Sequence, residues 1–157
     1  MLPATLDDVI EDGTVMPDPP TCMECGAAAV LTDGREVYPH RPDLYTKPLW
    51  ACRPCKASCG CHPGGYEPLG FPAGKATRQA RMRLHEDRLD PIWKGRKGAK
   101  KKRGQVYRLL SARMGLPPER THTGMFSIEQ CREAWRVLEG VTPENVGTLV
   151  HEIEAGR

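Results

Sequence analysis

The chain has 157 residues, with 16 glycines, 15 prolines and only 6% aromatic side chains, a composition that excludes a large aromatic-rich core. We therefore expect two small parts, of which the loop-rich one is held together by something besides hydrophobic burial, such as a metal ion. The net charge of +3 is spread unevenly, with −5 over residues 1–70, +11 over 71–113 and −3 over 114–157, and no apolar run reaches the roughly 20 residues of a membrane span.

Residues 1–20 are predicted to form an acidic flexible tail, because they end in Pro-Asp-Pro-Pro and show no sustained apolar period. They also lack a charged n-region followed by an apolar segment, so no secretory signal is expected. The chain has seven cysteines, an odd number that cannot pair completely into disulfides. We therefore expect a cytoplasmic protein whose thiols are free or bound to metal.

Residues 21–70 are predicted to form a zinc-binding ribbon. Short β-type pieces at Ala28–Thr32, Glu36–Tyr38 and Leu49–Ala51 alternate with turn-forming clusters of Asp, Gly and Pro. Such a pattern indicates hairpins around a metal. With the helices that follow, the expected fold class is α+β, in which a small β-hairpin zinc ribbon precedes a helical region, and a treble-clef arrangement is the alternative form of the ribbon.

Residues 71–157 are predicted to be helical, with a basic spacer at Lys94–Arg103. Ala76, Ala80 and Leu84 recur at the spacing of one helix face, and this first helix is expected to end near Asp90-Pro91. Proline disfavours the continuation of a helix, because it lacks the backbone N–H and its ring crowds the preceding turn.

Three further helices are expected after the spacer. The first stops at Gly115, ahead of two prolines. Ser127 and Gln130 fit a capping box at the start of the next helix, on whose apolar face Cys131 is predicted to be buried as a small hydrophobic residue. Thr142-Pro143 opens the last helix, since proline suits the first helical position.

Two Cys-x-x-Cys pairs provide the strongest chemical signal in the sequence. Each pair places two sulfurs on one side of a cation, and two pairs complete the tetrahedron that Zn²⁺ prefers. Gly26, directly after the first pair, suits a turn that points backbone N–H groups at sulfur. Because protein fills all four positions, we expect a structural zinc ion rather than a catalytic one. The predicted ligands are Cys22, Cys25, Cys52 and Cys55.

Three more side chains that can bind metal follow the second pair and leave an alternative open. Cys59, Cys61 and His62 lie close enough in sequence to replace a ligand or to begin a second site. A second complete site needs four ligands, and His40 and His85 are the candidates for the missing one. The simpler interpretation is that these side chains pack beside the first site.

Several short runs occur in an order that is similar to a known family. They are Tyr38-Pro39-His40-Arg41-Pro42-Asp43-Leu44-Tyr45, Lys47-Pro48-Leu49-Trp50, Gly60-Cys61-His62-Pro63-Gly64, Asp90-Pro91-Ile92-Trp93 and His122-Thr123-Gly124-Met125-Phe126. Over residues 21–138 the chain resembles a family of phage and prophage zinc-finger-containing proteins for which no activity is established. The resemblance implies a zinc finger and a phage or prophage origin. The lysine-rich spacer departs from that family, so its properties belong to this chain alone.

Seven cations fall within the ten residues Lys94–Arg103, with glycines between them. Such a segment has almost no apolar surface to bury, so we expect it to be mobile until it lies along phosphates and releases counterions. Arginines on the preceding helix would extend this track; the alternative is a solvated helix face beside a solubilising linker. The cations position DNA or RNA without reading its sequence. The predicted nucleic-acid-binding residues are Arg78, Arg81, Arg88, Lys94, Arg96, Lys97, Lys100, Lys101, Lys102 and Arg103.

The leading functional hypothesis is a phage zinc-finger protein that binds nucleic acid in the bacterial host cytoplasm, as an accessory in replication, recombination or transcription control. A zinc-stapled His-Asn-His nuclease is the enzymatic alternative, because His40 lies between the cysteine pairs and His62 follows them. Pro39 stands where that pattern has an acidic residue and no Asn follows, so an enzyme is the less favoured interpretation. The third alternative is an inhibitor that binds a host enzyme, with the acidic flanks meeting a basic partner.

Overall fold

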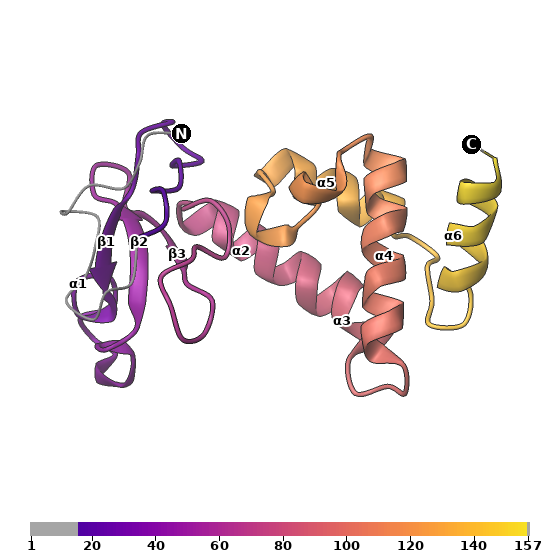
Figure 1. The fold of residues 1–157 in the computed structure, drawn as a ribbon, viewed down its shortest axis with the longest axis horizontal. Helices are drawn as coiled ribbons and strands as arrows, with labels where there is room; N and C mark the ends of the chain where they lie inside the picture. Colours follow the sequence, from indigo (N-terminus) through magenta and orange to yellow (C-terminus); the bar gives the residue numbers. More distant parts are fainter. Residues whose placement is uncertain (1–15, 157) are drawn as a thin grey trace. The chain divides into compact units, whose positions relative to one another are not determined.

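The computed structural model describes residues 16–156, so most of the predicted tail lies outside the described residues. The chain divides into two compact units between Gly74 and Lys75. A small sheet forms the first unit and the longer helices form the second (Figure 1). The predicted α+β class, with a small β ribbon followed by a helical region, is confirmed.

The first unit is built on strands β1 (Val30–Asp33), β2 (Pro48–Cys52) and β3 (Ala57–Gly60). They form an antiparallel sheet in the order β1-β2-β3. Trp50 in the central strand pairs with Leu31 on one side and with Cys59 on the other, and its side chain is buried. Its indole Nε1 donates a hydrogen bond of 2.8 Å to the backbone carbonyl of Tyr66. Trp50 therefore anchors the middle of the sheet and the loop that follows it.

The segment predicted as a strand at Glu36–Tyr38 is helical instead. Helix α1 (Gly34–Val37) begins after Asp33, whose carboxylate accepts hydrogen bonds from the backbone N–H groups of Arg35 and Glu36 at 3.0 and 3.4 Å. A side-chain cap of this kind satisfies helix donors locally, so it outweighs the β propensity of a short run.

The first unit extends to Gly74, beyond the predicted boundary at Gly70. The backbone N–H of Met23 donates to the carbonyl of Pro72 at 2.8 Å. Ala73 exchanges backbone hydrogen bonds with Ser58 in strand β3, at 3.1 and 3.2 Å. These contacts attach residues 71–74 to the ribbon rather than to the helices that follow.

The first helix of the second unit runs farther than predicted. It consists of α2 (Lys75–Leu84), a π-helical segment at His85–Leu89 and α3 (Asp90–Trp93). The expected end near Asp90-Pro91 is therefore wrong. Because a π turn closes its hydrogen bonds five residues apart, it opens the turn before Pro91 and relieves the steric conflict that proline causes in an α-helix.

Helix α4 (Ala99–Met114) includes the second half of the predicted spacer, so the expectation that residues 99–103 lack regular structure is wrong. Alanine, lysine and arginine have high helix propensity, and Gly98, with φ of 73°, adopts the left-handed conformation just before the helix. The helix ends at Gly115, as predicted, again with a positive φ. Within residues 16–156, no helix combines the length and apolar character needed to cross a membrane.

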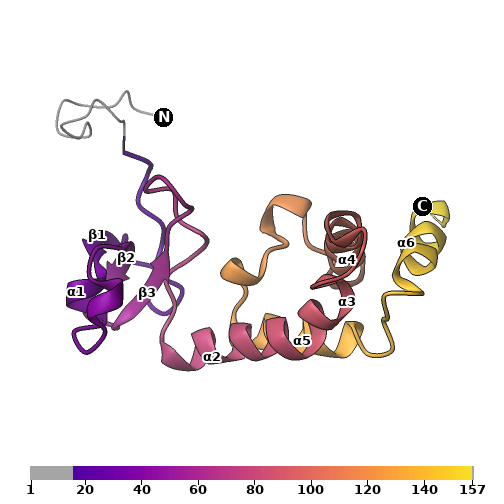
Figure 2. The same ribbon diagram turned by 90° about the horizontal axis from the view of Figure 1, so that it is seen from below.

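The capping box predicted before Ile128 is present, whereas the last helix begins at Val146, three residues after Pro143, so the expected start at Thr142-Pro143 is wrong. Helix α5 (Ile128–Val137) has a complete capping box, in which the Ser127 and Gln130 side chains each bond to the other's backbone N–H at 3.1 and 3.0 Å. Before helix α6 (Val146–Ala155), Thr142 and Asn145 make the same kind of reciprocal pair. Helix α2 lies beside α5, and α4 lies beside α6 (Figure 2).

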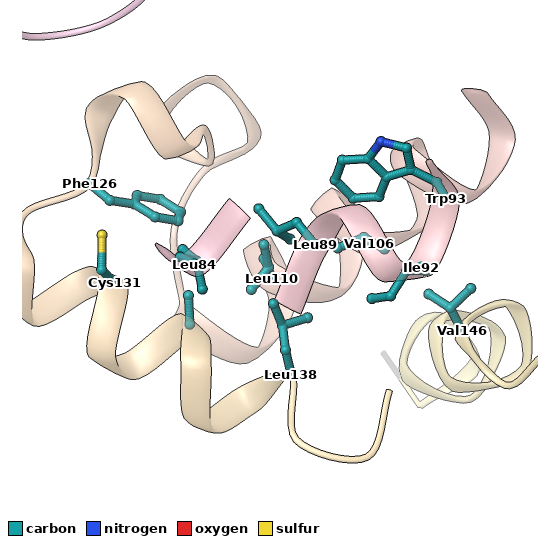
Figure 3. Packing of buried hydrophobic residues seen from close by; sticks show 11 residues of the cluster. Leu84, Leu89, Ile92, Trp93, Val106, Leu110, Phe126, Cys131, Leu138 and Val146 are labelled. Carbon is teal, nitrogen blue, oxygen red and sulfur yellow. The ribbon is translucent and has the colours of Figure 1, made fainter. Parts of the chain in front are cut away.

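One hydrophobic core holds the second unit together. Figure 3 shows that its side chains come from α2 and the π turn, from α3 and α4, from α5 with the residues that flank it, and from the start of α6. Cys131 is buried beside Phe126, which confirms the prediction that it packs as a small hydrophobic residue. The buried cluster is Leu84, Leu89, Ile92, Trp93, Val106, Leu110, Phe126, Cys131, Ala134, Leu138 and Val146.

Candidate metal centre

The first cysteine pair lies in a tight turn ahead of strand β1. The backbone N–H of Gly26 donates to the carbonyl of Cys22 at 2.9 Å, and Gly26 has a φ of 79°. The N–H of Glu24 points at the Cys22 sulfur at 3.4 Å. Gly26 therefore provides the left-handed residue that the turn needs, as the sequence predicted.

The second pair lies in the turn that joins β2 to β3. Cys52 is the last residue of β2, and Lys56, just after Cys55, has a φ of 54°. Lys56 occupies the same position in its pair as Gly26 does in the first pair. The sequence alone does not single out Lys56, although a position directly after a Cys-x-x-Cys pair is a usable signal for a left-handed residue. No helix begins at this second pair, so the unit has the form of a zinc ribbon rather than a treble clef.

The four sulfurs gather at one point. The Sγ atoms of Cys22, Cys25, Cys52 and Cys55 all lie within 4.8 Å of one another, and those of Cys25 and Cys52 are 3.7 Å apart. A tetrahedral Zn²⁺ site with Zn–S bonds of about 2.3 Å requires sulfur atoms roughly 3.8 Å apart. The four cysteines therefore fit a tetrahedral metal ion, with no coordination position left for a substrate.

Hydrogen bonds within the cluster divide the thiols by acidity. The backbone N–H of Ala27 lowers the pKa of Cys25, and hydrogen bonds from Cys55 and Cys52 lower it further. A hydrogen bond to Cys25 raises the pKa of Cys55 to about 12. Ionisation is thus favoured at Cys25 and disfavoured at Cys55, whose thiol is held protonated mainly by its hydrogen bond to Cys25. A divalent cation overcomes this difference and favours four thiolates.

The other predicted metal ligands lie apart from this cluster. Among residues 16–156, Cys22, Cys25, Cys52 and Cys55 form the one group of at least three His, Cys, Asp or Glu side chains close enough to share an ion. Cys59, Cys61 and His62 are not part of this group, and neither are His40 and His85. The Cys59 sulfur instead points at the carbonyl of Gly70 at 3.6 Å.

The predicted nucleic-acid-binding residues separate into exposed and half-buried groups. Lys102 is half-buried, and its Nζ donates to the carbonyl of Pro143 at 3.0 Å. Arg78, Arg81 and Arg88 on the preceding helix are also half-buried. The exposed members are Lys94, Arg96, Lys97, Lys100, Lys101 and Arg103.

The arginine stripe predicted to continue a phosphate track faces the protein interior in part. Arg81 Nε donates to the backbone carbonyl of Phe126 at 2.8 Å, and the Arg88 guanidinium lies over the Trp135 ring. These two side chains therefore contact residues in and next to helix α5. Helical spacing alone does not predict these contacts.

Comparison with known proteins identifies the family. No curated protein and no solved structure matches the chain. A model of a zinc-finger-containing domain matches residues 18–141, a range that includes both cysteine pairs and helices α2 to α5. The match covers most of the chain and includes the cluster of four cysteines. The chain therefore belongs to the zinc-finger-containing domain family DUF3268.

Proposed function

We propose that the cysteine cluster holds a structural zinc ion and that the chain is a nucleic-acid-binding accessory protein. In this proposal the basic segment, defined as Lys94–Arg103, contacts phosphates. One observation carries it: residues 91–118 contain nine lysines and arginines and no Asp or Glu, and six of the cations in the basic segment are exposed. A positive surface without internal carboxylates suits a polyanion.

The start of helix α4 adds a second argument. Lys100, Lys101, Lys102 and Arg103 occupy its first turns, and no acidic residue and no side-chain cap is present there. Cations at the N-terminus of a helix oppose the helix dipole, whereas an anion is stabilised by the dipole and by the free backbone N–H groups. A phosphate beside the basic segment would therefore relieve an unfavourable arrangement of charge.

The zinc ion would have a structural role in this proposal. The first unit has a small buried cluster, formed by Cys22, Cys52 and Ala57 with Cys55 packed against it, so metal binding supplies much of its folding free energy. The basic segment belongs to the second unit and reads no base edges by itself, which favours binding without sequence preference. The resemblance to phage and prophage proteins supports a role in phage replication, recombination or transcription control.

Salt dependence of binding tests the proposal directly. We would measure the affinity of the full chain for duplex DNA, single-stranded DNA and RNA across a series of salt concentrations. If about five cations each neutralise a phosphate, log K falls against log salt with a slope of roughly −4 on duplex DNA. The double variant Lys100→Gln/Lys101→Gln is expected to make that slope shallower by about 2. Glutamine keeps the helix propensity of these positions.

A matched control uses two exposed cations outside the basic segment. Lys47→Gln/Lys75→Gln removes the same charge, and both residues are exposed. The control is expected to keep the parent slope, because these lysines lie outside the proposed interface. Equal slopes for the parent, the double variant and the control would refute the proposal and leave the basic segment as a solubilising surface.

A further inference from the structure

A groove between helices α2 and α5 lies outside both the metal centre and the basic segment. It has a volume of about 400 Å³, and its lining combines an apolar floor with a basic rim. The floor is formed by Ala80, Leu84, Cys131 and Trp135, and the rim is formed by Arg83, Arg132 and Arg136. We refer to it as the arginine-rimmed groove.

The rim has positive charge that is little neutralised by ion pairs within the described residues. Arg132 and Arg136 are exposed and lie one turn apart on α5. In the part of the chain that the structure describes, no ion pair involves either of them. Arg83 makes a 3.8 Å contact with Asp87, and both side chains are largely open to water, so this pair is weak.

The floor offers an apolar strip without a negative charge. The Cys131 thiol is buried, and burial raises its pKa to about 11, so it is neutral at physiological pH. Trp135 has one face of its ring covered by Arg88, whose guanidinium carbon is 4.4 Å from the ring centroid. A ligand for this groove must therefore be both apolar and acidic.

We propose that the arginine-rimmed groove binds an acidic amphipathic helix of a partner protein. A helix that lies between α2 and α5 would place aliphatic side chains at i, i+3, i+4 and i+7 on the floor and its carboxylates against the three arginines. Charge complementarity would orient the helix and speed its association. Nucleic acid fits the groove less well, because the floor is mostly aliphatic and the stacking surface of its one aromatic ring is already partly covered.

This inference goes beyond the proposed function and is tested with the full, zinc-loaded chain. The probe is a synthetic peptide of about four helical turns, with leucines at i, i+3, i+4 and i+7 and Asp or Glu at the outer positions, and its binding is followed by fluorescence anisotropy. A scrambled peptide of the same composition, in which the leucines share no face, is the peptide control. The proposal expects the amphipathic peptide to bind at least about tenfold more tightly than the scrambled one.

Two variants locate the binding site. Arg132→Gln/Arg136→Gln removes exposed rim charge and is expected to weaken binding about fivefold. Ala80→Phe fills the floor and is expected to abolish binding, whereas Ala76→Phe, at an exposed position of the same helix, is the matched control and binds as the parent does. If Ala80→Phe fails to fold, the arginine variant still decides the question, because its changes lie on the surface.

Binding of an oligonucleotide separates this proposal from the proposed function. Lys100→Gln/Lys101→Gln is expected to weaken binding of the oligonucleotide and to leave binding of the peptide unchanged. The groove variants are expected to weaken binding of the peptide and to leave binding of the oligonucleotide unchanged. Weaker binding of the oligonucleotide by the groove variants would assign the groove to nucleic acid and overturn the proposal. Equal binding of both peptides, or unchanged peptide binding in both groove variants, would also overturn it. Tighter peptide binding after removal of residues 1–15 would assign the groove to the chain's own acidic end instead of a partner.

Discussion

The guanidinium of Arg88 lies over the indole ring of Trp135, with its central carbon 4.4 Å from the ring centroid. Such a cation–π contact, half-buried, contributes about 1 kcal/mol. Arg88→Ala is therefore expected to lower the unfolding free energy of the second unit by about 1 kcal/mol, as measured by loss of helical circular dichroism in denaturant. Arg83→Ala, at an exposed position of the preceding helix, is the control and should change little. Equal effects of the two changes would refute the role of the contact.

Removal of metal is expected to unfold the first unit while the second stays folded. The buried cluster of the first unit consists mainly of metal-binding cysteines, whereas the second has a hydrophobic core of its own. The indole N–H signals in an NMR spectrum report on this difference. On addition of a chelator, the signal of Trp50 should shift to its unfolded position while those of Trp93 and Trp135 stay. Elemental analysis should find one zinc ion per chain before chelation, and a zinc-free preparation with an unchanged Trp50 signal would contradict the prediction.

Gly34→Ala is expected to destabilise the ribbon by about 1–3 kcal/mol. A Cβ atom at Gly34 would overlap the backbone carbonyl of Leu44, which cannot move away as a flexible side chain could. Gly65→Ala is the matched control, because a Cβ atom there meets nothing within 4 Å and the backbone is not left-handed. Zinc affinity and the midpoint of denaturant unfolding should both fall for Gly34→Ala alone. If both variants have the zinc affinity and unfolding midpoint of the parent, the backbone around Leu44 moves to make room for the added Cβ atom, and the prediction is wrong.

Stability of the second unit is expected to fall between about pH 9 and pH 11, in a manner that depends on Cys131. Burial raises the pKa of this thiol from 9.0 to about 11. Below pH 9 the thiol is protonated in both states, and between these values the unfolded state loses the proton first, so unfolding is favoured as pH rises. The free energy of unfolding is expected to fall by roughly 2 kcal/mol over this pH range. Denaturant midpoints of the parent and of Cys131→Ala should therefore converge as pH increases, and curves that stay parallel would disprove the linkage.

Features fixed by neighbours in sequence could be predicted. The Ser127–Gln130 capping box is present, and Gly26 has the positive φ that the turn at the first cysteine pair needs. Each Cys-x-x-Cys turn places two sulfurs together by local geometry alone, and the capping box likewise joins residues only three positions apart. The meeting of the two cysteine pairs is different, because Cys25 and Cys52 are 27 positions apart, and it was predicted from the chemistry of a tetrahedral zinc site rather than from local structure.

Features that depend on distant contacts could not be predicted. Strand β3 is rich in small residues and has little β propensity, yet it forms because the second cysteine pair turns it back onto β2. Arg81 and Arg88 fit an exposed stripe by spacing, but their partners Phe126 and Trp135 lie more than 40 residues away. The π turn was also missed, since nothing in the local sequence distinguishes it from an α-helical turn.

The cationic start of helix α4 has a consequence for backbone motion. Its first intrahelical hydrogen bond runs from the N–H of Lys102 to the carbonyl of Gly98, so the amides of Ala99, Lys100 and Lys101 have no partner earlier in the helix. Repulsion among the charges lowers the free energy of local opening, and these amides should exchange with deuterium faster than those near Leu110. A phosphate bound there would slow exchange at these few amides first. The exchange rates of these backbone amides would thus report whether nucleic acid is bound, independently of any side-chain contact.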